Sequence, residues 1–140
     1  MYKRIQKTIP GAPRKVLIID EDSLSGDIIS KILSYYLDCE VNMVSNEAGA
    51  LSFLKSQKFD LVIIAASSSG MAGIALVDNI QNLNSNIPIL VVCGNGTDHE
   101  LEVLKSKGIN KIVFKPLRIS PLLELVASAF IENDQVPSYA

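Results

Sequence analysis

Five short runs of β-branched and other apolar residues alternate along this chain with segments whose apolar side chains recur every three or four positions. The apolar runs occupy residues 15–20, 39–44, 59–65, 87–93 and 111–114. The segments with helical periodicity occupy residues 23–37, 46–56, 74–83, 97–107 and 121–132. Continuous apolar runs predict strands buried on both faces, as in a parallel sheet. The alternation therefore predicts an α/β domain, with a five-stranded, doubly wound parallel sheet and helices on both faces.

Local sequence signals predict where several of the helices begin and end. Asn46 suits a helix N-cap, Thr97-x-x-Glu100 suits a capping box, and Ser120-Pro121 suits an N-cap followed by the first helical residue. Gly108 follows a cationic last turn and suits a helix stop. The small and polar segment 66–73 is expected to form a loop.

Composition excludes several broad classes of function. With 140 residues the chain suits one domain, and a net charge of −2 gives no electrostatic reason to expect nucleic acid or membrane binding. We expect a flexible lead-in over 1–14, a domain over 15–133 and a tail over 134–140. No stretch approaches the ~20 apolar residues of a membrane helix, so a cytoplasmic location is expected.

The two cysteines are expected to be small buried hydrophobes rather than a disulfide. Cys39 begins one predicted strand and Cys93 ends another, which puts them at opposite ends of parallel strands. A redox-sensing Cys93, with its pKa lowered by Lys115, is a minor alternative.

Chemistry is expected where the predicted strands end. Ligands of open α/β sheets bind outside the carboxyl ends of the strands. Those ends are Asp20, Ala65, Cys93 and Phe114-Lys115.

These strand ends resemble those of the receiver domains of two-component response regulators. The family has an acidic pair after the first strand, here Asp20-Glu21, and a lysine-proline pair after the fifth, here Lys115-Pro116. Its third strand and the following loop fit residues 60–73 without a gap, since Asp60, Gly70, Met71 and Gly73 match. The resemblance covers residues 15 to about 132 and implies a flavodoxin-like (CheY-like) fold with strand order 2-1-3-4-5.

The resemblance also implies that the chain is degenerate, because Ala65 stands at the position of the phosphoacceptor aspartate. Ser69 replaces the loop proline, Cys93 replaces the Thr or Ser of the fourth strand, and Ile112 replaces the aromatic switch residue. Pro116 is kept. Several altered positions in one switch favour natural divergence over a single engineered change.

Asp20, Glu21 and Lys115 are then expected to form a vestigial acidic pocket. An alanine methyl has no lone pair with which to accept a phosphoryl group. Losing one carboxylate also removes a Mg²⁺ ligand, so we expect no cofactor, with Mg²⁺ absent or weakly bound and Asp20 and Glu21 as the residual candidates. We further expect Lys115 to pair directly with Asp20 or Glu21.

The expected function is signal transduction by protein contact, as a pseudo-receiver that is not an enzyme. The resemblance implies a protein partner such as a histidine kinase or an output protein. It also motivates the hypothesis of a homodimer through the fourth helix, fifth strand and fifth helix. Two alternatives stay open: a phosphorelay receiver phosphorylated at another residue, for which Ser67 to Ser69 offer hydroxyls, and a flavodoxin-like small-molecule binder.

Overall fold

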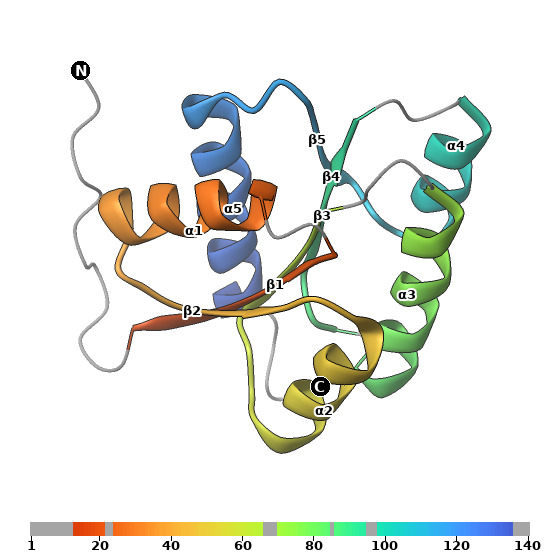
Figure 1. The fold of residues 1–140 in the computed structure, drawn as a ribbon, viewed down its shortest axis with the longest axis horizontal. Helices are drawn as coiled ribbons and strands as arrows, with labels where there is room; N and C mark the ends of the chain where they lie inside the picture. The colour runs from red at the N-terminus through yellow and green to blue at the C-terminus, as the bar shows by residue number, and fades with distance from the viewer. Residues whose placement is uncertain (1–12, 22–23, 66–69, 85, 95–97, 136–140) are drawn as a thin grey trace.

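A five-stranded parallel sheet in the order β2-β1-β3-β4-β5 forms the centre of the molecule (Figure 1). This computed structural model describes residues 13–21, 24–65, 70–84, 86–94 and 98–135. The strands are β1 (Arg14–Asp20), β2 (Cys39–Val44), β3 (Leu61–Ala65), β4 (Ile89–Cys93) and β5 (Lys111–Phe114). The helices are α1 (Leu24–Tyr36), α2 (Glu47–Ser56), α3 (Gly70–Leu83), α4 (Asp98–Ser106) and α5 (Ile119–Gln135). The predicted fold class and strand order are confirmed.

Two helices, α1 and α5, cover one face of the sheet, and α2, α3 and α4 cover the other (Figure 1). Successive strand side chains point to opposite faces, so Val16 and Ile18 pack with α1 and α5 while Leu17 and Ile19 pack with the other layer. Every residue of β3 and β4 is buried. Burial on both faces explains why these strands are continuous apolar runs.

Two of the local signals for helix ends are confirmed, at Asn46 and at Gly108. The Asn46 side chain accepts a hydrogen bond from the Gly49 N–H at 2.7 Å, as an N-cap does. Gly108 has a φ of 86°, a left-handed conformation that glycine adopts without a Cβ clash. The capping box at Thr97 and the assignments of 1–12 and 136–140 lie outside the described residues.

Two predicted helix starts were wrong, by four residues for α3 and by two for α5. Helix α3 begins at Gly70, so residues 70–73 are helical rather than part of a loop. Helix α5 begins at Ile119, which places Ser120 inside the first turn rather than at the N-cap. Buried Leu122, Leu123 and Val126 anchor α5 against the sheet, and tertiary packing of this kind outweighs local propensity.

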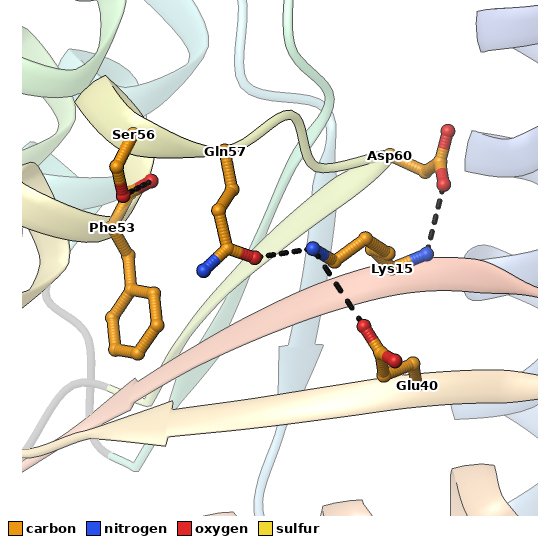
Figure 2. A network of polar contacts seen from close by, with 6 residues as sticks. All are labelled: Lys15, Glu40, Phe53, Ser56, Gln57 and Asp60. Atoms are coloured by element: carbon orange, nitrogen blue, oxygen red, sulfur yellow. Dashed lines mark hydrogen bonds and ion pairs between the residues drawn. The ribbon is translucent and has the colours of Figure 1, made fainter.

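A polar network holds the amino ends of β1 and β3 together (Figure 2). The Lys15 N–H donates to the Asp60 carboxylate at 2.8 Å, and the Asp60 N–H donates to the Lys15 carbonyl at 2.8 Å. The Lys15 ammonium also donates to the Gln57 side chain and lies 3.6 Å from a Glu40 carboxylate oxygen. The network fixes the strand register at the edge of the sheet opposite Ala65.

A second tie joins β5 to the end of α5. Lys111 is only 5% exposed, and its ammonium donates to a Glu132 carboxylate oxygen at 2.6 Å. That hydrogen bond holds the pKa of Glu132 below its ordinary value. No helix within the described part of the chain is long and apolar enough to span a bilayer.

We expect Glu132→Gln to lower the free energy of unfolding by about 1–2 kcal/mol at neutral pH, because the buried Lys111 ammonium loses its carboxylate. Urea denaturation measures the change, with Glu124→Gln, an exposed carboxylate on the same helix, as the matched control. The depressed pKa means that the stabilisation is present above the ordinary glutamate pKa and is lost as pH falls through the lower, folded value. A difference between wild type and variant that grows on acidification would contradict this assignment.

Candidate functional site

The carboxyl ends of the strands meet at one edge of the sheet, as the sequence predicted. In the parallel ladder Asp20 lies opposite Ala65, and Cys93 lies opposite Phe114. The Lys115 N–H donates to the Cys93 carbonyl at 2.9 Å and continues the pairing by one residue. Neighbouring strands lie about 4.8 Å apart, so Ala65 is directly beside Asp20.

Ala65 is buried, with 6% of its surface exposed. It is the last residue of β3, and its methyl side chain offers no hydrogen-bond acceptor. Its position between β1 and β4 is therefore occupied by a group that can neither attack an electrophile nor ligate a metal.

Asp20 is the buried acid of the site, at 4% exposure. Its carboxylate accepts a hydrogen bond from the Gly26 N–H, in the first turn of α1, at 2.6 Å. A negative charge there satisfies one of the unpaired amides at the helix start and complements the helix dipole. A Cβ on Gly26 would lie 3.2 Å from both Asp20 Cβ and Oδ2, so glycine permits this close approach.

Sequence reasoning missed Gly26, although a glycine early in a predicted amphipathic helix is a signal of close packing. The residue joins the strand-end acid to α1 and gives Asp20 a structural partner.

Lys115 and Glu21 lie at the same edge but are exposed. Between the described residues, no ion pair joins Lys115 to Asp20 or Glu21, so the pairing expected from the sequence is not formed. The physical reason is solvation. An exposed ammonium keeps its water, and a surface ion pair returns little free energy for ordering a long side chain.

The remaining switch positions follow β4 and β5. Ile112 is half-buried and packs against the core under α2, α3 and α4. Phe114 is 49% exposed, and Pro116 is exposed after a cis Lys115–Pro116 peptide bond.

Neither cysteine is in a disulfide. Burial, followed by the nearby Glu100, raises the pKa of Cys93. Burial, followed by Asp38, raises the pKa of Cys39 to about 12. Because the thiolate is the reactive form, the raised pKa values contradict the redox-sensor alternative for Cys93.

The acids of this edge form a small set. No group of three or more His, Cys, Asp or Glu side chains gathers in metal-binding geometry among the residues that the structure describes. Asp20 and Glu21 are the carboxylates that the structure describes at the end of β1, and Asp20 already accepts a hydrogen bond from a backbone amide.

A hollow of about 280 Å³ lies at the opposite edge of the sheet, at the amino ends of β4 and β5. Its lining includes Lys107 and Lys111, whose ammonium groups are each 2.6 Å from a carboxylate oxygen, of Asp78 and Glu132 respectively. Ligands of such sheets bind at the carboxyl edge. The hollow therefore does not favour the small-molecule alternative.

Comparison with known proteins defines the family. The sequence profile of the response regulator receiver domain matches residues 16–127. The chain belongs to this family.

Two curated relatives are longer proteins that match this chain over one segment. The chain is 29% identical over 101 residues to transcription factor SKN7 of Saccharomyces cerevisiae, covering 72% of this chain and 16% of that protein. It is 30% identical over 115 residues to the two-component response regulator-like PRR37 of Oryza sativa, covering 79% of this chain and 15% of that protein. The chain thus spans less than a fifth of the length of these relatives.

Solved receiver structures share the fold. The receiver domain protein (CheY-like) of Methanospirillum hungatei superposes with a TM-score of 0.80 at 20% identity, covering 89% of this chain and 98% of that one. The chemotaxis protein CheY4 of Vibrio cholerae gives 0.73 at 24% identity, covering 84% and 99%. Receiver domains are signalling modules that interact with histidine kinases and output domains.

We expect Asp20→Ala to destabilise the protein by about 1–2 kcal/mol, because the Gly26 N–H loses its acceptor. Asp20→Asn keeps an acceptor oxygen and should lose less. Chemical denaturation compares both with Glu21→Ala, the exposed neighbour, which should be close to neutral. Equal stability of Asp20→Ala and wild type would show that the hydrogen bond contributes nothing.

Proposed function

We propose that this receiver domain is a pseudo-receiver, which signals by protein contact without aspartyl phosphorylation. The observation that carries the proposal is Ala65, at the end of β3 and in register with Asp20. Phosphoryl transfer needs an oxygen nucleophile in line with the leaving group. A methyl group supplies none, and no side-chain rearrangement of Ala65 would restore one.

The surviving charges support a pocket without Mg²⁺. Three carboxylates and one lysine would carry a formal charge near −2, whereas Asp20, Glu21 and Lys115 carry a charge near −1. The weaker negative field and the lost ligand both reduce the attraction for a divalent cation. The Gly26 amide further stabilises the Asp20 carboxylate without a metal.

The output is proposed to be a constant surface rather than a switched one. In a phosphorylated receiver, the modification shifts an equilibrium between two conformations. Ile112 packs against the core where the family has an aromatic switch residue, and Ala65 cannot accept the phosphoryl group that would drive the switch. A domain without a phosphoacceptor and without the aromatic switch residue would stay in one conformation.

The proposed docking face consists of α4, β5 and α5, and its partner is a histidine kinase or an output protein. Exposed α4 side chains include His99, Glu102 and Lys105, which suit recognition by charge and hydrogen bonds. The names of the relatives include both transcription factors and sensor proteins, so either kind of output is compatible with this fold.

Acetyl phosphate with Mg²⁺ should leave the wild-type protein unmodified. Intact-mass spectrometry measures the result, with a receiver domain that has its aspartate as the positive control. A single added phosphoryl group that is labile to acid and hydroxylamine would overturn the proposal in favour of acceptance at another carboxylate. An acid-stable phosphate would point to a hydroxyl acceptor and would overturn it equally.

Mg²⁺ at millimolar concentration should not change the thermal midpoint of the wild type beyond the effect of NaCl at equal ionic strength. Ala65→Asp places a third carboxylate beside Asp20, so its midpoint should rise with Mg²⁺ by roughly 2–5 °C. Saturable stabilisation of the wild type would contradict the proposed metal-free pocket. A variant that ignores Mg²⁺ would show that position 65 is not the cause.

A further inference from the structure

Helix α1 carries a stripe of large apolar side chains on its solvent side. Leu24 is 69% exposed, Ile28 is 47% exposed and Tyr35 is 69% exposed. At 3.6 residues per turn, these three side chains fall within an arc of about 40°. The buried residues Ile29 and Leu33 face the sheet from the other side of the helix. Exposed apolar side chains that gather on one face, rather than scatter, mark an interaction surface.

The charges of α1 are balanced along this stripe. Asp27 and Lys31 are the only charged residues of the helix, and both are exposed. Their four-residue spacing would allow an ion pair within the helix. Within the described residues no such pair forms, since the recorded ion pairs involve neither side chain. Each therefore faces solvent beside the apolar stripe.

We propose that the stripe of Leu24, Ile28, Lys31 and Tyr35, flanked by Asp27, binds the same stripe of a second copy in an antiparallel, two-fold arrangement. A two-fold axis at the level of Ile29 sets Leu24 of one copy against Tyr35 of the other. The same axis brings Asp27 of each copy within reach of Lys31 of the other. One acid and one base, equally placed about the axis, make the face complementary to itself, as an isologous interface requires.

The charge balance argues against other occupants. A nucleic acid or an anionic lipid surface would need a basic face, whereas α1 carries one charge of each sign. The inference goes beyond the proposed function and does not rest on it. The stripe lies on α1, which is not part of the α4–β5–α5 docking face, although α1 and α5 are in contact.

The interface is small. Stable complexes bury about 1,200–2,000 Å² in total, and one helix stripe per copy lies at or below the lower end. The dimer is therefore expected to be weak and concentration-dependent, with dissociation in the micromolar to millimolar range.

Analytical ultracentrifugation of the wild type should show a reversible monomer–dimer equilibrium, which Ile28→Glu abolishes. Leu83→Glu is the matched control, because Leu83 is 42% exposed on α3 and lies outside both the stripe and the α4–β5–α5 face. The control should dimerise like the wild type. Circular dichroism confirms that both variants remain folded.

Charge exchange tests the antiparallel geometry directly. Asp27→Lys gives a face with two positive charges and Lys31→Asp gives one with two negative charges, so each variant alone should be monomeric. An equimolar mixture should form a heterodimer about as tight as the wild-type dimer, because it restores the same two Asp–Lys contacts, and added salt should weaken it.

Three results would overturn the proposal. The wild type could stay monomeric up to millimolar concentration, which would assign the stripe to a different protein. The dimer could survive Ile28→Glu, which would move it to another face such as α4–β5–α5. The mixture of charge variants could fail to associate, which would exclude the antiparallel arrangement. None of these results bears on phosphorylation, so the two proposals can fail separately.

Discussion

Burial of β3 and β4 on both faces of the sheet is the constraint on which the rest of the structure depends. A strand without a solvent face must be covered by helices on both sides, and parallel pairing then requires each helix to return the chain to the starting edge. This requirement brings all carboxyl ends to one edge. Asp20 and Ala65 meet there because their strands are neighbours in register, although 45 positions separate them in sequence (65 − 20).

At that edge, the buried carboxylate of Asp20 has a structural role. A buried carboxylate must be stabilised by opposite charge or by hydrogen bonds. For Asp20 the structure provides the Gly26 amide at the start of α1, where the helix dipole also favours negative charge. Asp20 thereby fixes the start of α1, while Lys115 at the end of β5 is exposed to solvent.

The sequence predicted those features whose cause lies within a few residues. The Asn46 cap depends on an amide three residues later, and the helix end at Gly108 depends on the backbone conformation of that glycine. Both features could therefore be predicted from the sequence. The start of α3 at Gly70 and the failure of Lys115 to pair with Asp20 were not found. These depend on packing and solvation between segments far apart in the chain, which no local pattern records.

The sequence by itself determined the order of strands and helices, the family resemblance and the absence of a nucleophile at position 65, because periodicity and side-chain identity are properties of the chain. Only the tertiary structure decided that Asp20 accepts a hydrogen bond from Gly26 and that Leu24, Ile28 and Tyr35 share a solvent-facing stripe. The apolar periodicity of residues 23–37 includes Leu24 and Ile28, and by that pattern alone both would face the core. Which side of an amphipathic helix meets the sheet depends on the complete packing of both layers, and here the sheet takes Ile29 and Leu33 instead.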